Sequence, residues 1–167
     1  MRHIVLIGMM GCGKTTCGKL LSARLGRPLV DTDRTIEQAE GCSISELFAR
    51  HGEAYFRDRE TALVRELSRR EGLILATGGG LPLREENRTL LRGSGIVFFL
   101  RRPPEVIFDA TDLAGRPLAR QGREDFLRRY REREPVYRAA AHYAIDNTGT
   151  PEEAVRRILA CLAEEPL

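Results

Sequence analysis

Short apolar runs alternate with longer segments of mixed polarity along the whole chain. The runs are rich in Val, Ile and Leu with little polar alternation, which is typical of strands buried on both faces. The predicted strands are His3–Ile7, Pro28–Asp31, Leu73–Ala76, Gly95–Leu100 and Tyr143–Asp146. The predicted helices are Lys14–Leu25, Ile44–Arg50, Glu53–Arg70, Arg84–Leu91, Pro104–Asp109, Glu124–Ala140 and Pro151–Ala163. This alternation predicts an α/β fold built on a parallel sheet.

Composition narrows the class of protein. The chain has 167 residues, of which 42% are hydrophobic and 31% charged, as expected of one folded, soluble domain. Its longest apolar runs, Ile4–Gly11 and Gly95–Leu100, fall well short of the ~20 residues that cross a bilayer, and no signal peptide is predicted. A net charge of +3 is too small to indicate nucleic-acid binding. Four cysteines without zinc-binding spacing favour a reduced, cytoplasmic chain.

A glycine-rich motif follows the first predicted strand and opens the first predicted helix. Gly8-Met-Met-Gly-Cys-Gly13-Lys14-Thr15 matches the Walker A pattern, whose backbone N–H groups and helix N-terminus bind phosphates. Lys14 is expected to reach the β- and γ-phosphates of a nucleotide, and the Thr15 hydroxyl to bind Mg²⁺. The flanking strand and helix argue against the alternative of a plain glycine-rich turn. The residues expected at the nucleotide are Gly11, Cys12, Gly13, Lys14, Thr15 and Thr16.

Acidic residues and glycines follow the next two predicted strands. Asp31 and Asp33 end the second strand, and Gly78–Gly80 follows the third. Because ligands of open α/β sheets gather at the carboxyl ends of the strands, these groups are expected to share one crevice with the glycine-rich motif. No Asp ends the third strand, so Asp31 is the predicted acidic ligand of Mg²⁺ beside Thr15. The alternatives are helix capping for the two aspartates and a sharp turn for the glycines.

Arg57 is a further candidate, in a charged stretch that is predicted to be helical. Glu53 and Glu60 lie four and three residues away from it, so an exposed ladder of ion pairs is the alternative interpretation.

These segments, in this order, resemble shikimate kinase over nearly the whole chain. The Walker A motif is shared by many families, whereas the other segments are more specific. The resemblance rests on Gly8–Thr16, Asp31–Asp33 with Ile36-Glu37, Gly41–Ile44, Glu46–Phe48, Gly52-Glu53 with Phe56-Arg57 and Glu60, Gly78–Gly80, Arg116–Leu118 and Arg133–Arg138.

The resemblance implies a three-layer P-loop kinase fold, similar to that of nucleoside monophosphate kinases. Its five parallel strands would have the order 2-3-1-4-5 in a single kinase domain, 1–167, with a substrate-binding subdomain at about 32–60 and a lid at about 111–123. The implied reaction transfers a phosphoryl group from ATP, with Mg²⁺, to the 3-hydroxyl of shikimate in aromatic amino-acid biosynthesis. The implied partners are ATP and shikimate, without nucleic acid or membrane, and the implied state is a monomer.

Residue roles follow from the same resemblance, position by position. The implied catalytic residues are Lys14, Asp33 and Arg116, of which Asp33 would bind the reacting hydroxyl and act as its base. The implied substrate contacts are Asp33, Arg57 and Arg133, the two arginines holding the carboxylate, with the backbone amides of Gly79 and Gly80. Phe48 and Phe56 would wall the ring or belong to the core. Members of the family commonly carry an Arg that stacks on adenine where this chain reads Phe108-Asp109-Ala110-Thr111, and the adenine edge falls near Asn147 or Thr148.

Two other functions compete with this interpretation. A kinase for another small hydroxy acid or polyol, such as gluconate, would keep the phosphate motif but use another acceptor. A non-catalytic nucleotide sensor or an RNA-binding protein would be expected to lose Lys14 or Arg116, and both residues are present. The chain also has no Trp and four Tyr, few of the aromatic platforms that bind single strands.

Overall fold

A computed structural model describes residues 1–110 and 119–166, with side chains from 122 onward in the second range. Five parallel strands form one sheet in the order β2-β3-β1-β4-β5. The strands are β1 (His3–Ile7), β2 (Leu29–Asp31), β3 (Ile74–Ala76), β4 (Gly95–Arg101) and β5 (Tyr143–Asp146). The predicted parallel sheet and its strand order are therefore confirmed, with ends shifted by one residue in β2, β3 and β4.

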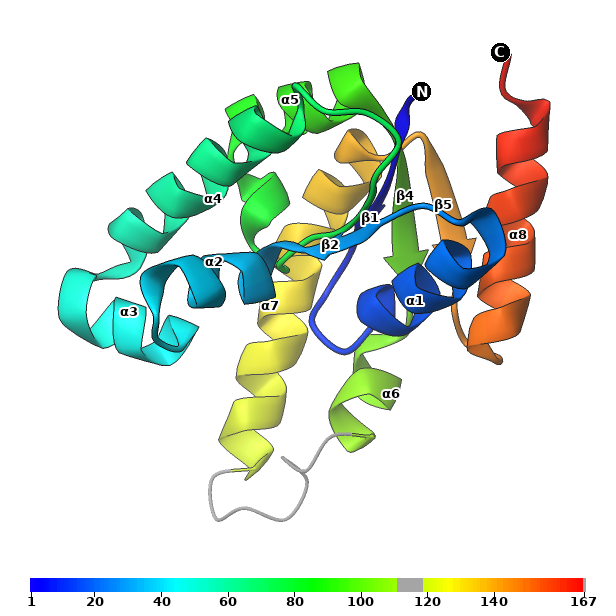
Figure 1. Cartoon of the computed structure of the whole chain (residues 1–167). Coiled ribbons are helices and arrows are strands. Elements are labelled where there is room, and N and C mark those ends of the chain that lie inside the picture. The colour runs from blue at the N-terminus through cyan, green and yellow to red at the C-terminus, as the bar shows by residue number, and fades with distance from the viewer. Residues whose placement is uncertain (111–118, 167) are drawn as a thin grey trace.

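Helices cover both faces of this sheet, which gives three layers (Figure 1). Helices α1 and α8 pack on one face, and α4, α5 and α7 lie on the other. The helices are α1 (Lys14–Leu25), α2 (Thr32–Glu40), α3 (Ile44–His51), α4 (Glu53–Leu67), α5 (Glu85–Ser94), α6 (Pro104–Asp109), α7 (Ala119–Ala140) and α8 (Pro151–Glu164). A single 3₁₀ turn, Leu81–Leu83, leads into α5.

The central strands explain the absence of polar alternation in the sequence. All five residues of β1 and the first six of β4 are buried, because helices lie against both faces of the sheet. A second, smaller apolar cluster joins Ile36, Leu47 and Phe56 from α2, α3 and α4. It lies within the range predicted as a substrate-binding subdomain, and that assignment stays a prediction.

One helix was not predicted, and the ends of several others differ from the prediction; α4, for example, ends at Leu67 instead of Arg70. Helix α2 was not predicted, because only Thr32 and Ile36 of its nine residues are buried and no apolar stripe marks it. Its start is fixed by Asp31, whose Oδ1 accepts a hydrogen bond from the Arg34 N–H at 3.2 Å. Helix α7 begins at Ala119, so 119–123 of the predicted lid is helical. The remainder of that lid, 111–118, and with it Arg116, lies outside the described residues.

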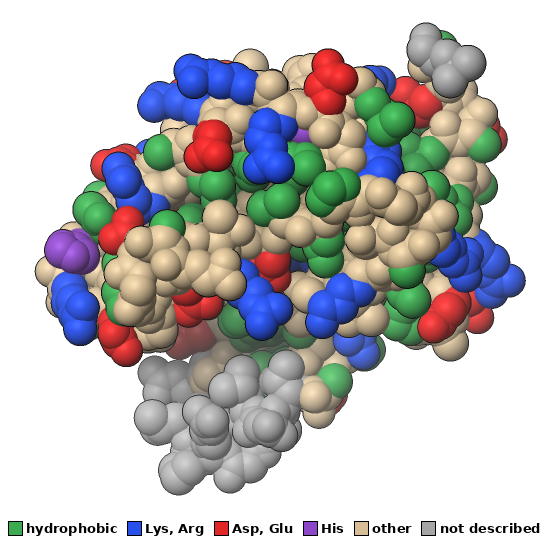
Figure 2. Space-filling model, in the orientation of Figure 1, with side chains coloured by type: hydrophobic (Ala, Val, Ile, Leu, Met, Phe, Trp, Pro, Cys, Tyr) green, Lys and Arg blue, Asp and Glu red, His purple; other side chains and the backbone are tan. Residues whose placement is uncertain are grey.

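Two features of the molecule bear on nucleic-acid binding and on crossing a membrane. They are its surface charge and the apolar length of its helices. Acidic and basic side chains are interspersed over the face drawn in Figure 2, and no broad basic patch is visible there. Within the residues that the structure describes, no helix is both long and apolar enough to cross a membrane.

Candidate active site

One cavity of about 1000 Å³ lies at the carboxyl ends of β1, β2 and β3. The connections after these three strands contribute the glycine-rich loop, the start of α2 and Gly78–Gly80. Helices α4 and α7 add Arg57 and Arg133. The cavity lining includes, among the residues predicted for the site, Gly11, Gly13, Lys14, Thr15, Thr16, Asp31, Asp33, Arg57, Gly79, Gly80 and Arg133. The structure thus brings together residues that span most of the chain.

The loop after β1 adopts a conformation that only glycine tolerates well. Gly8, Gly11 and Gly13 have φ angles of +147°, +83° and +99°, in the region that L side chains rarely adopt. A Cβ on Gly13 would also lie 2.5 Å from Asn147 Nδ2. Cys12 is 1% exposed and is not part of the cavity lining, and its N–H donates to the Met9 carbonyl oxygen at 3.1 Å.

Lys14 is held by the loop that precedes it. Its Nζ donates to the carbonyl oxygens of Gly8 at 2.7 Å and Met9 at 2.9 Å. The ammonium therefore lies beside the N-terminus of α1, where helix N–H groups add positive potential. A cation and unpaired N–H groups at one point of a cavity are what a phosphate group binds.

Asn147 supports the same loop from the far end of the chain. It follows β5, its side chain is 8% exposed, and its Nδ2 donates to the Cys12 carbonyl at 2.7 Å. The sequence placed Asn147 or Thr148 near an adenine edge and missed this supporting contact. The available signal was its position at the carboxyl end of a strand, the edge where the other site residues gather.

Thr15 and Asp31 meet as predicted for a magnesium site. Thr15 Oγ1 donates to Asp31 Oδ2 at 3.1 Å, while the other carboxylate oxygen caps α2, so capping and site formation hold together. Among the described residues, no group of three His, Cys, Asp or Glu side chains could hold a metal. Two oxygen ligands fit Mg²⁺, which is commonly bound by one or two protein oxygens together with substrate phosphates and water.

Gly78–Gly80 lies in a turn and is also closely approached by neighbouring side chains. None of the three has a φ angle in the left-handed region. A Cβ on Gly78 would lie 2.4 Å from Asp33 Oδ1, and one on Gly80 would lie 2.4 Å from both Arg57 Nη1 and Nη2. The backbone thus passes directly beside a carboxylate and a guanidinium, and it also turns here, because the Leu81 N–H donates to the Gly78 carbonyl oxygen at 3.1 Å. Thr32 Oγ1 fixes this approach by accepting the Gly78 N–H at 2.9 Å.

Asp33 is partly shielded from water at this point. Burial raises the pKa of its carboxyl, and the negative charge of Asp31 raises it further, whereas Lys14 and Arg57 oppose the shift. A carboxylate in this setting takes up a proton more readily than an exposed Asp, which suits a group that exchanges protons with a bound hydroxyl.

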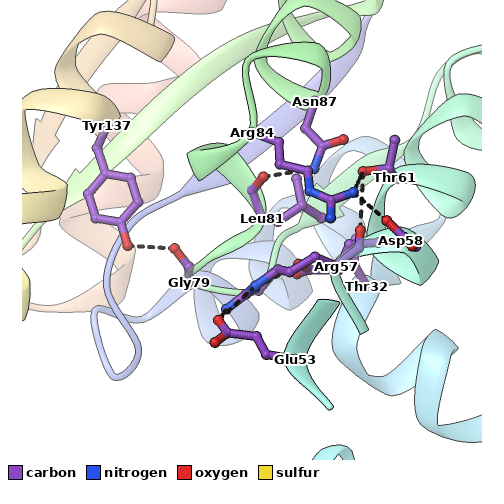
Figure 3. Close-up of polar contacts among 12 residues, drawn as sticks. Thr32, Glu53, Arg57, Asp58, Thr61, Gly79, Leu81, Arg84, Asn87 and Tyr137 are labelled. Atoms are coloured by element: carbon purple, nitrogen blue, oxygen red, sulfur yellow. Dashed lines mark hydrogen bonds and ion pairs between the residues drawn. The ribbon is translucent and has the colours of Figure 1, made fainter. Parts of the chain in front are cut away.

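Arg57 forms the predicted ion-pair ladder, but one of its partners is buried. Its Nη1 donates to Glu60 Oε1 at 2.6 Å, and its Nη2 donates to Glu53 Oε1 at 3.2 Å (Figure 3). Glu60 is fully buried, whereas 66% of the Glu53 side chain is exposed. Burial raises the pKa of Glu60, and the hydrogen bond from Arg57 counteracts this shift. Glu60 therefore holds the guanidinium in place, whereas the sequence indicated only an exposed ion pair between Glu60 and Arg57.

Helix α7 is tied to the glycine segment through Tyr137. The Tyr137 hydroxyl donates to the Gly79 carbonyl at 2.6 Å (Figure 3), and burial raises the pKa of this phenol to about 12, so it remains a donor. One turn earlier on the same helix is Arg133, whose Nη1 would lie 3.5 Å from a Cβ on Gly79. Arg57 thus lies beside Gly80, whereas Arg133 lies beside Gly79.

Comparison with known proteins gives consistent matches over nearly the full length. Residues 10–163 match the family model described as shikimate kinase. The shikimate kinase of Pelotomaculum thermopropionicum is 41% identical over 167 residues, which cover 98% of this chain and 97% of that protein. That of Burkholderia pseudomallei is 42% identical over 152 residues, covering 89% and 82%.

Solved structures agree with the sequence matches. A shikimate kinase from Acinetobacter baumannii in complex with shikimate has a TM-score of 0.87 and 37% identity, and the match covers 100% of this chain and 96% of that one. A gluconokinase from Sinorhizobium meliloti has a TM-score of 0.60 at 19% identity, covering 97% and 91%. At that identity, the second likeness concerns the fold alone.

Proposed function

The chain belongs to the shikimate kinase family and phosphorylates shikimate with ATP in aromatic amino-acid biosynthesis, and from that premise we propose how its residues divide the work. The observation that carries the proposal is one cavity that is lined by Lys14 and in which Asp33 and Arg57 lie beside Gly78 and Gly80. Lys14 marks one end of the cavity as the donor site, and the glycine segment marks the other as the acceptor site.

At the donor end, the loop binds the phosphates of ATP. The backbone N–H groups of Gly11, Cys12 and Gly13, with Thr16 at the start of α1, surround the phosphates, and Lys14 leaves its carbonyl partners to neutralise the phosphoryl group in transfer. Thr15 and Asp31 hold Mg²⁺, which draws charge from the phosphate oxygens when bound. Arg116, outside the described residues, is proposed to add a second positive charge to the transferring group.

At the acceptor end, Asp33 accepts a hydrogen bond from the 3-hydroxyl of shikimate and takes its proton as the new bond forms. The Gly79 and Gly80 N–H groups orient the ring beside it. Arg57 and Arg133 bind the carboxylate of shikimate. Because Glu53 is exposed and its hydrogen bonds to Arg57 are long, the substrate carboxylate can replace Glu53 while the buried Glu60 stays in place.

The proposal extends to the state of the protein in the cell. The cysteines at 12, 17, 42 and 161 are all free thiols, which fits the reducing cytoplasm better than an oxidising compartment. We propose a cytoplasmic monomer, and light scattering of the purified protein tests the oligomeric state directly.

Removing Arg57 or Arg133 is expected to weaken the use of shikimate selectively. Arg57→Ala or Arg133→Ala should lower kcat/KM for shikimate by about ten- to a hundredfold, because each loses a charge-assisted contact worth roughly 1.5–3 kcal/mol. The KM for ATP should stay within about twofold. Arg57→Lys should remain impaired, since an ammonium cannot form two parallel hydrogen bonds to a carboxylate. Steady-state kinetics with each substrate varied in turn provide the measurement.

A shikimate analogue with an amide in place of the carboxylate separates recognition from structural damage. Wild type should use the amide poorly, and Arg57→Ala should lose little more with it. An equal loss for the acid and the amide would show that Arg57 supports the fold only. Gluconate belongs in the same assay, and turnover of gluconate in preference to shikimate would contradict the proposed acceptor.

Gly80→Ala is expected to weaken the use of shikimate indirectly, through the side chain of Arg57. Its Cβ would displace the Arg57 guanidinium, so KM for shikimate should rise about tenfold, approaching the loss of that contact. Gly93→Ala in α5 is the matched control, because no atom lies within 4 Å of its Cβ, and its kinetics should be unchanged. If Gly80→Ala and Gly93→Ala behave alike, the close approach of Arg57 has no role in the acceptor site.

A further inference from the structure

Arg102 lies at the entrance of α6, beside the phosphate-binding loop, and has no role in the function proposed above. It follows the last residue of β4, and its side chain belongs to the lining of the main cavity together with Gly11, Gly13 and Lys14. Its Nη1 donates to the Gly11 carbonyl oxygen at 3.3 Å. This cation is therefore in contact with the loop that binds phosphates.

The backbone that carries Arg102 is constrained by the residues next to it. The tip of the loop lies against α6 so closely that a Cβ on Gly11 would be 2.8 Å from Ile107 Cγ2. Pro103 and Pro104 then restrict the backbone between Arg102 and this helix. The guanidinium is thus carried by a rigid junction, although its own side chain is only partly buried.

The charge of Arg102 is not neutralised within the described part of the chain. Its guanidinium donates to a neutral carbonyl oxygen, a weak partner for a group that carries five N–H donors. The neighbouring Arg101 differs, since its Nε donates to Asp146 Oδ1 at 2.8 Å across to β5. Arg57, across the cavity, is paired with Glu53 and Glu60. Arg101 is thus paired with a carboxylate, whereas within the described residues the adjacent Arg102 is not.

We infer that Arg102 binds the polyphosphate chain of the nucleotide beside Gly11 of the loop. The inference rests on the proposed assignment of ATP to the loop that contains Lys14. A nucleoside triphosphate carries more negative charge than one lysine neutralises, and a guanidinium forms paired hydrogen bonds to phosphate oxygens. The Gly11 carbonyl holds the side chain next to the place where those oxygens bind. Arg102 is therefore a residue for affinity toward the phosphates.

Binding of a nonhydrolysable ATP analogue and of inorganic tripolyphosphate, both with Mg²⁺, tests this role by calorimetry. Arg102→Gln removes the charge but keeps a donor for the Gly11 carbonyl, so a purely structural role would survive this substitution. We expect the Kd of both ligands to rise about three- to tenfold, as for a partly exposed ion pair, and KM for shikimate to be unchanged. Arg101→Gln is the matched control, with both Kd values within about twofold of wild type. The effect of Arg102→Gln should shrink at high salt.

Each other outcome overturns the inference or the function on which it rests. Unchanged Kd values in Arg102→Gln, or equal increases in Arg101→Gln, would overturn the assignment. Weaker binding of the ATP analogue with unchanged tripolyphosphate binding would place Arg102 on the adenosine part instead, and would overturn it also. If wild type and Lys14→Met bind the two ligands equally, the proposed phosphate site itself is wrong.

Discussion

Lys14→Met is expected to abolish measurable phosphoryl transfer, a loss of at least about a hundred- to a thousandfold in kcat. The ammonium is the one cation within the loop, and its charge is needed most when the phosphoryl group is between donor and acceptor. The fold should persist, because Nζ contacts only carbonyl oxygens and a thiol of the same loop. A coupled assay of ADP release measures turnover, and circular dichroism with thermal unfolding measures the fold.

The chain offers a control of the same chemistry. Its other lysine, Lys19, is exposed on α1, and Lys19→Met should keep wild-type kcat. A folded Lys14→Met protein that turns over at a near-normal rate would refute the assignment of the loop as the donor site.

Asp33→Asn is expected to lower kcat by about 10²–10⁴-fold, the usual contribution of a positioned general base. The amide keeps the size of the side chain but cannot take the proton of the acceptor hydroxyl. Asp58→Asn is the control, since Asp58 is an exposed partner of Arg84, and turnover should not change (Figure 3).

The pH profile identifies the reason for the loss. Burial and Asp31 raise the pKa of Asp33, so wild-type kcat/KM for shikimate should fall with acid at a higher pH than an ordinary aspartate would cause. The active form is the deprotonated one, so activity is complete above this raised pKa and is lost as the pH falls through it. Residual activity of Asp33→Asn should lack this acidic limb. If the limb persists in Asp33→Asn, another group controls it and Asp33 only orients the hydroxyl.

Local patterns in the sequence were sufficient for the strands of a parallel sheet and for the loop, whereas the strand order was implied by the family resemblance. Buried parallel strands are continuous apolar runs, and the Walker A spacing reflects φ angles that glycine adopts easily. Helix α2 was not predicted because only two of its nine residues are buried. Its start is marked by a capping interaction, and no apolar stripe follows. Its capping residue, Asp31, lines the cavity beside Thr15, and its role as a magnesium ligand stays a prediction.

Contacts between residues that are far apart in the sequence could not be predicted from local sequence patterns. The three glycines in a row were noticed, yet the reason for them lies in Asp33 and Arg57, which come from other elements. The same holds for Glu60, which is a plausible ladder partner in sequence and becomes a buried anchor only when α4 packs beside the cavity. Burial of a charge depends on tertiary packing, so a single sequence cannot distinguish these two situations.

The hydrogen bond from Asn147 to Cys12 joins residues 135 positions apart, and this separation matters while the protein is being synthesised. The loop that we assign to the phosphates is synthesised 135 residues before the amide that braces it. Strand β1 can likewise form its hydrogen bonds in the sheet only after its neighbours, β3 and β4, have been synthesised. A nascent chain that has reached only β4 therefore carries an unbraced loop, and the proposed nucleotide site is completed only after Asn147 has been translated.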